Sequence, residues 1–197
     1  MGTFEDRLAW VDAAEMRLAQ NRDEMRNAFD AIAGGNVKTF LEIGSLAGAS
    51  LYVYAGACEP GALLVAVDAP RTPFNRARLG QTCEALRAEG YVVEFVDTPS
   101  HYPTTALRVG ELAPRVDALH IDGSHKPCIV AADYRLYSPL VRPGGLIFLH
   151  DVGAVNCPGP TGVFLAAKGR KTLWDFGNEY RAGGDCGIGM IEVGEGV

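Results

Sequence analysis

The stretch FLEIGSLAGAS, residues 40–50, decides the fold class, because it is an apolar run that ends in glycines. Gly44 and Gly48 let the backbone turn tightly and approach a ligand before a helix begins. The run predicts a first strand at 38–43. Further apolar runs follow at 62–68, 91–96, 116–121 and 144–150, and each interval is long enough for a helix. This alternation is typical of a parallel sheet with helices on both faces, so we predict an α/β fold.

Residues 1–35 are predicted to form a helix in front of this core, because apolar residues recur there at steps of three, four or seven. They are Phe4, Leu8, Val11, Leu18, Met25, Phe29 and Ile32. The face that they form can pack on the core or on a second copy of the chain, so the sequence leaves open whether the protein forms a homo-oligomer. No repeat or linker divides the chain. We therefore predict one domain, 1–197, with its α/β core at 36–197.

The end of the chain carries two apolar runs, at 172–177 and 187–193, separated by a short, glycine-rich, polar stretch. Since a parallel pair needs a longer crossover, these runs predict two neighbouring antiparallel strands. The five cysteines are widely spaced and contain no CxxC pair: Cys58, Cys83, Cys128, Cys157 and Cys186. This spacing predicts separate reduced thiols, with neither a disulfide framework nor a structural zinc site.

Charge and hydropathy argue against two classes of partner. The chain has 18 Lys and Arg against 24 Asp and Glu, a net charge of −6, which is the wrong sign for binding nucleic acid through phosphates. No apolar run approaches the roughly 20 residues of a membrane span, and the first residues carry acids where a signal peptide is basic. We expect a cytoplasmic protein with no nucleic-acid or membrane partner.

Polar side chains follow the predicted strands at their carboxyl ends, where ligands bind in open α/β sheets. The first strand leads into a loop that could hold a cofactor and includes Glu42, Gly44, Ser45, Gly48 and Ser50. Asp68 ends the second strand. Its separation from Glu42 along the sequence suits an acid that accepts both hydroxyls of a ribose. Asp97 and Thr98 end the third strand. Asp97 suits an adenine amino group, and a simple turn residue is the alternative.

Two acids and two imidazoles lie at or just after the ends of the fourth and fifth strands: Asp122, His125, His150 and Asp151. Asp122, His150 and Asp151 would offer two carboxylates and a ring nitrogen to one divalent ion, which leaves His125 as a general base. Each residue also has a structural explanation, such as a turn for Asp122 or a buried position for His150. His120, one residue inside the strand, is expected to be structural.

Taken in order, five segments resemble the class I methyltransferases that depend on S-adenosylmethionine (SAM). They are FLEIGSLAGAS (40–50), Asp68, LHIDGSHKP (119–127), DYRLYSPLVRPGGLIFLHDV (133–152) and GIGMIEV (187–193). The resemblance is to the small-molecule O-methyltransferase branch, which contains catechol-type enzymes, macrolide sugar enzymes and the family named after cephalosporin hydroxylase. It implies a Rossmann-like sheet of seven mostly parallel strands whose last strand is antiparallel.

The resemblance also implies roles for the residues named above. The loop from Gly44 to Ser50 would wrap the amino-acid part of SAM, Asp68 would take the ribose hydroxyls, and the region of Asp97 would line the adenine. Asp122 would contact the cofactor and, with the pair His150-Asp151, would bind magnesium, while His125 would be the base.

The chain departs from the family pattern at two positions. His150 stands where the sugar-methylating relatives usually carry an acid, and Val152 stands where catechol-type enzymes supply an amide ligand. Magnesium prefers oxygen ligands, so manganese, zinc or iron stays open, as does a site without metal.

The predicted activity is O-methylation of a small-molecule hydroxyl, in which a divalent ion favours the alkoxide and His125 accepts the proton. A non-haem metal hydroxylase is one alternative, although the glycine loop and Asp68 would then have no role. A catalytically silent regulator that binds the cofactor is another, against which the residues around Asp122 argue. A nicotinamide-dependent oxidoreductase and a serine hydrolase are disfavoured, because neither GxGxxG nor GxSxG occurs.

Overall fold

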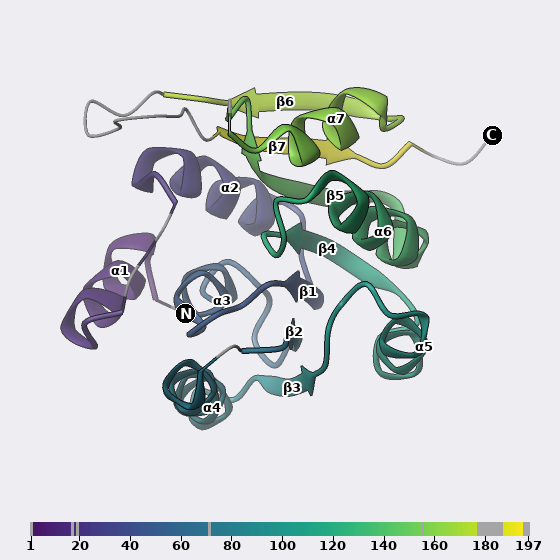
Figure 1. Cartoon of the computed structure of the whole chain (residues 1–197). Coiled ribbons are helices and arrows are strands. Elements are labelled where there is room, and N and C mark those ends of the chain that lie inside the picture. The colour runs from purple at the N-terminus through teal and green to yellow at the C-terminus, as the bar shows by residue number, and fades with distance from the viewer. Residues whose placement is uncertain are drawn as a thin grey trace.

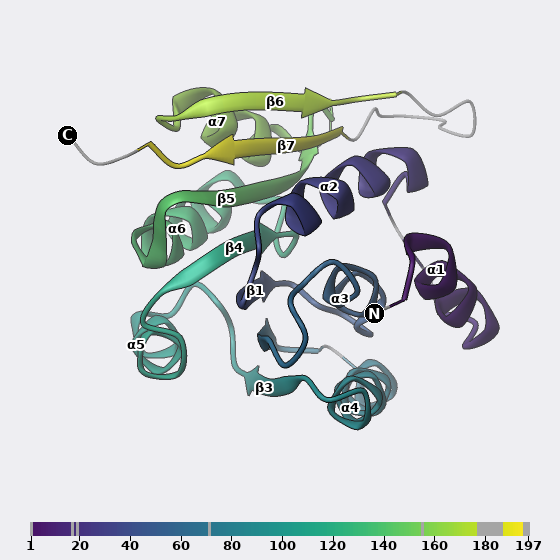
Figure 2. The ribbon, with the colours of Figure 1, turned by 180° about the vertical axis from the view of Figure 1, so that it is seen from behind.

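The computed structural model describes residues 2–16, 18, 20–70, 72–154, 156–176 and 187–194, and within them the strands form one sheet. Its strands are β1 (Thr39–Ile43), β2 (Leu63–Asp68), β3 (Val92–Asp97), β4 (Val116–Ile121), β5 (Val141–Val152), β6 (Arg170–Trp174) and β7 (Gly187–Glu192). They lie in the order β3-β2-β1-β4-β5-β7-β6, with β3 and β6 at the two edges (Figures 1 and 2). Strands β1 to β5 pair in parallel, and β7 is antiparallel to both β5 and β6. The predicted fold class is confirmed.

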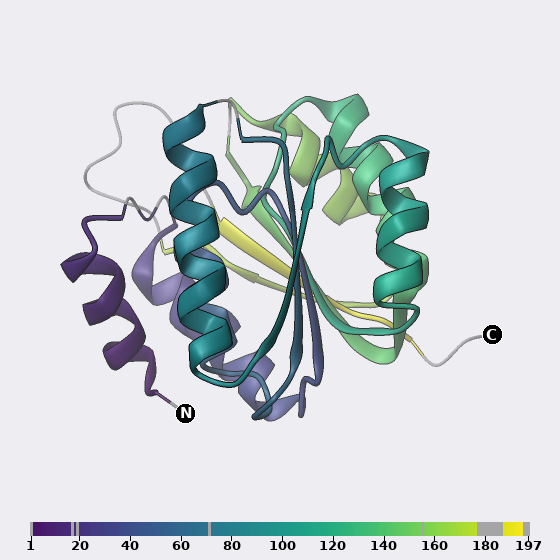
Figure 3. The same cartoon turned by 90° about the horizontal axis from the view of Figure 1, so that it is seen from below.

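Helices cover both faces of the sheet (Figure 3). One face carries α1 (Phe4–Ala13), α2 (Arg22–Gly34), α3 (Ala49–Ala55) and α4 (Pro73–Ala88); the other carries α5 (Pro103–Leu112), α6 (Pro127–Tyr137) and α7 (Pro158–Ala166), and a short 3₁₀ helix, Ser138–Leu140, follows α6. Successive strand residues point to opposite faces, so Phe40 joins the core under α1 to α4, whereas Leu41 joins the core under α5 to α7. The apolar strand runs in the sequence reflect burial on both faces.

The N-terminal segment forms two helices where the sequence predicted one. The apolar stripe was predicted correctly, since Phe4, Val11 and Ile32 are all buried. However, the Asn21 side chain accepts hydrogen bonds from the N–H groups of Asp23 and Glu24 and so caps a new helix. A cap that satisfies the free N–H groups of a first turn favours a break in front of it.

The C-terminal pair of strands agrees with the prediction, since Trp174 on β6 pairs with Ile188 on β7 in an antiparallel ladder. Cys186 lies outside the described residues. Cys58 and Cys83 are buried thiols, Cys157 is partly buried and Cys128 is exposed. Within the described ranges, no helix combines the length and the apolar character needed to cross a membrane.

Candidate functional site

A cavity of about 570 Å³ opens at the carboxyl ends of β1, β2 and β4. Strands β1 to β5 are parallel, so the residues that follow them meet at one edge of the sheet. Four segments from this edge line the cavity, namely the loop after β1, residues 67–70, residues 99–101 and residues 122–126. Gln20 closes it from the connection between α1 and α2.

The loop after β1 depends on glycine at position 44. Gly44 has φ +91°, and a Cβ there would lie 2.2 Å from the carbonyl oxygen of Asp122. Its N–H donates to the carbonyl of Val67, and the N–H of Asp122 donates to the carbonyl of Ile43, both at 2.8 Å. The absence of a side chain therefore lets three strand ends meet at one point.

Three more residues of the predicted cofactor loop differ in where they lie: two are on the cavity wall and one is behind it. Ser45 and Ser50 are buried residues on the cavity wall. Gly48, with φ +89°, lies behind the wall as the N-cap of α3, and a Cβ there would lie 2.7 Å from Cγ2 of Thr82 on α4. Gly48 thus allows α3 and α4 to pack closely, and its predicted contact with the cofactor stays a prediction.

Asp68 is held at the cavity by the loop itself. The N–H of Leu46 donates to Oδ2 of Asp68 at 2.5 Å, and Leu46 adopts the left-handed conformation, with φ +48°. Such a conformation is costly for a branched side chain and is found where surrounding contacts enforce it. The end of β2 and the glycine loop therefore form one unit that presents a carboxylate to the cavity.

Asp97 and Thr98, the predicted cofactor contacts at the end of β3, do not lie on the cavity wall. Asp97 is exposed and pairs with Arg76 of α4, while the Thr98 hydroxyl lies 3.0 Å from the hydroxyl of Thr105. The residues that follow them, Pro99 to His101, line the cavity instead. The side of the cavity expected for adenine is thus lined by residues 99–101, which come directly after Thr98 in the sequence.

Glu42 lies behind the cavity in a buried pair with His120. Its Oε1 is 3.0 Å from Nδ1 of His120, and both side chains are fully buried. The two residues face each other across the parallel pair β1 and β4. His120 also packs edge-on against the ring of Tyr54, with centroids 5.2 Å apart. Both side chains therefore lie in the core behind the cavity, and neither is among the residues that line it.

The predicted metal ligands come together. One potential ligand atom from each of Asp122, His150 and Asp151 lies within 4.8 Å of the others. Nδ1 of His150 is 3.3 Å from Oδ1 of Asp122 and 3.2 Å from Oδ2 of Asp151. Gln20 donates from its side-chain amide to Oδ2 of Asp122.

A local irregularity in β5 explains how two successive residues reach one cluster. Side chains normally alternate between the faces of a strand, but the pairing of β5 with β7 is interrupted between Leu149 and Val152. Within this interruption Asp151 has φ +60°, a conformation that a residue without glycine's freedom rarely adopts. The bulge turns Asp151 toward Asp122 and His150, as bulges beside functional sites often do.

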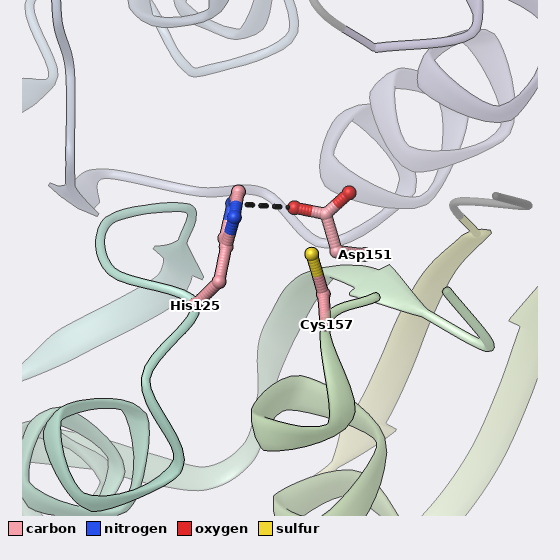
Figure 4. A group of neighbouring side chains, drawn as sticks. All are labelled: His125, Asp151 and Cys157. Carbon is pink, nitrogen blue, oxygen red and sulfur yellow. Dashed lines mark ion pairs between the residues drawn. The ribbon is translucent and has the colours of Figure 1, made fainter. Parts of the chain in front are cut away.

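His125 completes the arrangement from the loop after β4. Its Nε2 lies 2.8 Å from Oδ2 of Asp151 (Figure 4), and its half-exposed ring lines the cavity. A carboxylate only accepts hydrogen bonds, so a neutral His125 donates its Nε2–H to Asp151 and keeps the lone pair on Nδ1. The ring is thereby oriented with one nitrogen available to accept a proton.

Gln20 and Asp133 belong to this region and were missed from the sequence. Gln20 sits in the connection between two helices, where no pattern marks it. Asp133 of α6 is fully buried, and its Oδ2 is 3.9 Å from the position that a Cβ would take on Gly123. Burial raises the pKa of Asp133 to about 6, against smaller opposite effects from Ser100 and His101.

Asp133 is expected to make the stability of the protein depend on pH. Its pKa is higher in the folded state than the ordinary value of 3.8, so the unfolded chain loses this proton first as the pH rises. The free energy of unfolding therefore decreases as the pH rises from 4 to 6, by about 3 kcal/mol in all. The variant Asp133→Asn does not titrate, so its free energy of unfolding should gain about that amount relative to the natural protein between pH 4 and pH 7.

Urea denaturation of both proteins at pH 4, 5, 6 and 7 measures this difference, and the other titrating groups cancel in the comparison. A difference that stays constant over this range would show that Asp133 is ionised equally in the folded and unfolded states.

Comparisons with known proteins agree with this architecture. Residues 41–152, more than half of the chain, match the family model described as a methyltransferase domain. This region runs from β1 to the end of β5 and includes Asp68, Asp122, His125 and Asp151. The comparison with curated proteins finds no match.

Solved structures share the fold at low sequence identity. A Klebsiella pneumoniae protein assigned as an O-methyltransferase is 19% identical, with a TM-score of 0.69 over 98% of this chain and 90% of that chain. The O-methyltransferase TomG of Streptomyces achromogenes, in complex with SAM, is 19% identical, with a TM-score of 0.65 over 97% and 89%. An O-methyltransferase of Bacillus cereus in complex with SAH is also 19% identical, with a TM-score of 0.65 over 96% and 90%. The match over β1 to β5 and the order of the seven strands support the same conclusion: the chain belongs to the methyltransferase domain family.

Proposed function

We propose that this methyltransferase transfers a methyl group from SAM to a hydroxyl group of a small molecule, with assistance from a divalent ion. The observation that carries the proposal is that the glycine loop, Asp68 and the segment from Asp122 to His125 all line one cavity. Two proteins of the same fold, TomG and the Bacillus cereus enzyme, support it through their complexes with SAM and SAH. The net charge of −6 favours a small acceptor over a nucleic acid.

The cavity fits SAM in size and in chemistry. Its volume of about 570 Å³ is within the usual range for small-ligand sites. Asp68 can accept both hydroxyls of a ribose, since an ionised carboxylate offers several acceptor positions and no donor. Ser45 and Ser50 would serve the amino-acid part, and residues 99–101 would enclose the adenine. Acidic side chains around the cavity suit a cationic sulfonium group.

The residues Asp122, His150 and Asp151 would hold the divalent ion. Two carboxylates and one imidazole suit manganese or another transition ion better than magnesium, which prefers oxygen alone. The amide of Gln20 supports this set by donating to Asp122. When bound, the ion would stabilise the deprotonated form of the acceptor hydroxyl.

His125 would remove the proton from that hydroxyl. Asp151 accepts the Nε2–H of His125 and thereby fixes the ring, so the lone pair on Nδ1 takes the proton. The acceptor oxygen then forms a bond to the methyl carbon as the bond from carbon to the sulfonium sulfur breaks, and SAH is released. The proton stays on His125 until solvent removes it.

The ion site predicts a selective loss of metal affinity. Asp122→Ala and Asp151→Ala are each expected to weaken Mn²⁺ binding at least tenfold, because each removes a charged ligand from a set of three. Calorimetric titration with Mn²⁺ measures the change, and Asp97→Ala, which removes an acid outside the cavity, is the matched control. Mn²⁺ affinity at the natural level in both Asp122→Ala and Asp151→Ala would contradict the assignment.

The activity is tested with SAM labelled in its methyl group and a panel of phenols, sugars and other small alcohols. We expect SAH formation that depends on the acceptor, and a product that has gained one methyl group by mass spectrometry. A non-haem hydroxylase would instead consume oxygen and form no SAH. A silent regulator would bind SAM without transfer to any acceptor. Either of these two results would overturn the proposal.

A further inference from the structure

A second group of metal-binding side chains lies beside the first. One ligand atom from each of His125, Asp151 and Cys157 lies within 4.8 Å of the others. They come from the loop after β4, the end of β5 and the residue before α7, and Figure 4 shows the side chains of His125 and Asp151 directed at each other with the sulfur of Cys157 close by. Asp151 is common to this group and to the proposed manganese site.

The main chain holds these three segments together. Gly159, in the first turn of α7, packs so closely on the His125 loop that a Cβ there would lie 2.8 Å from the carbonyl oxygen of His125 and 3.1 Å from Cα of Pro127. The N–H of Gly153 donates to the hydroxyl of Thr161 at 2.8 Å, which joins the end of β5 to α7. These contacts therefore fix the relative positions of the three segments that carry the ligand atoms.

The donor set differs in kind from that of Asp122, His150 and Asp151. Imidazole nitrogen, carboxylate oxygen and thiolate sulfur are the ligands that Zn²⁺ takes in proteins, and three of them leave a fourth position open. In tetrahedral zinc sites the ligand atoms lie about 3.3 to 3.8 Å apart, as bond lengths of roughly 2.0 to 2.3 Å require. The group needs side-chain adjustments of about 1 Å to reach this geometry. A sulfur ligand selects zinc over manganese and magnesium.

We infer that His125, Asp151 and Cys157 form a zinc site, and that zinc bound there inhibits the enzyme. The second part rests on the proposed function, in which Nδ1 of His125 is the base. Zinc on Nε2 takes the place of its proton, and a neutral imidazole with one nitrogen bound to a metal carries its proton on the other. Nδ1 is then protonated and has no lone pair for the acceptor hydroxyl. Zinc binding and proton acceptance from the substrate therefore exclude each other at the ring of His125.

Co²⁺ is the probe for the site, because its bond to a thiolate gives a charge-transfer band in the near ultraviolet. The natural protein and Cys128→Ser, which changes an exposed cysteine on the neighbouring helix α6, are expected to show this band. Cys157→Ser and His125→Ala should lose it, whereas Asp122→Asn should keep it. Competition with a zinc-binding dye should show at least tenfold weaker Zn²⁺ binding by Cys157→Ser than by Cys128→Ser.

The assignment of the site would be overturned if the natural protein showed no band, or if Cys157→Ser or His125→Ala kept it. These measurements need no methyl acceptor, so they stand even if the proposed function fails. With an active acceptor, Cys157→Ser should keep its basal rate and require at least tenfold more Zn²⁺ for half inhibition. Equal inhibition of Cys157→Ser and Cys128→Ser would overturn the regulatory part alone.

Discussion

Replacing His125 by alanine is expected to lower the rate of methyl transfer by about 10² to 10⁴, with little change in the affinity for SAM. An alcohol is a weak nucleophile at neutral pH, and the structure offers this ring, oriented by Asp151 at 2.8 Å, to accept its proton. The residue contributes to proton removal and not to holding the cofactor. The loss should therefore appear in kcat, while the dissociation constant of SAM stays within about threefold.

A single-turnover experiment with saturating SAM separates this chemical step from product release. His101→Ala is the matched control, because it removes another imidazole from the cavity wall, whereas the ring paired with Asp151 is that of His125. It is expected to retain the rate of transfer within about tenfold. Added imidazole should restore part of the activity of His125→Ala. Equal rates for the His125 and His101 variants would remove His125 from the reaction.

Replacing Asp68 by alanine is expected to weaken SAM binding by about 10² to 10⁴. The change removes the acceptor for two ribose hydroxyls, each hydrogen bond to a charged group being worth about 1.5 to 3 kcal/mol. It also removes the acceptor of the Leu46 N–H, a hydrogen bond that helps to hold Leu46 in its left-handed conformation. Asp68→Asn keeps a carbonyl oxygen for Leu46 but loses the charge, so an intermediate loss is expected.

Titration calorimetry with SAM measures these affinities. Asp97→Ala is again the control. Asp97 is the last residue of β3 and pairs with Asp68 in the register of β2 and β3, but its carboxylate forms an ion pair with Arg76. Its SAM affinity should change less than about threefold. A result in which Asp97→Ala loses more affinity than Asp68→Ala would reverse the assignment of the two acids.

Much of the fold could be predicted because its determinants are local. Strands buried on both faces give continuous apolar runs, so the positions of β1 to β4 agree with the sequence within about one residue. Parallel pairing then brings the residues after each strand to one edge, which is why Asp122, His150 and Asp151 could be grouped before their geometry was known.

The rest depends on contacts between distant segments. Glu42 points to the same side as Phe40 by strand alternation, but its pairing with His120 depends on β4 lying beside β1. The ion pair of Asp97 with Arg76 depends on the position of α4.

The same holds for two residues beside the metal ligands. Gln20 donates to Asp122 from the residue before Asn21, which caps a second helix. Cys157 lies near His125 where Gly159 packs closely on the His125 loop. One domain over 1–197 and a cytoplasmic location stay predictions, and the oligomeric state stays open.

The most direct test of the central claim is the binding of SAM, SAH and NAD to the natural protein and to Asp68→Ala, measured by titration calorimetry. The account predicts one site for SAM and SAH in the natural protein, no binding of NAD, and loss of the SAM site in Asp68→Ala. Preference for NAD, or SAM binding of equal strength in both proteins, would contradict it.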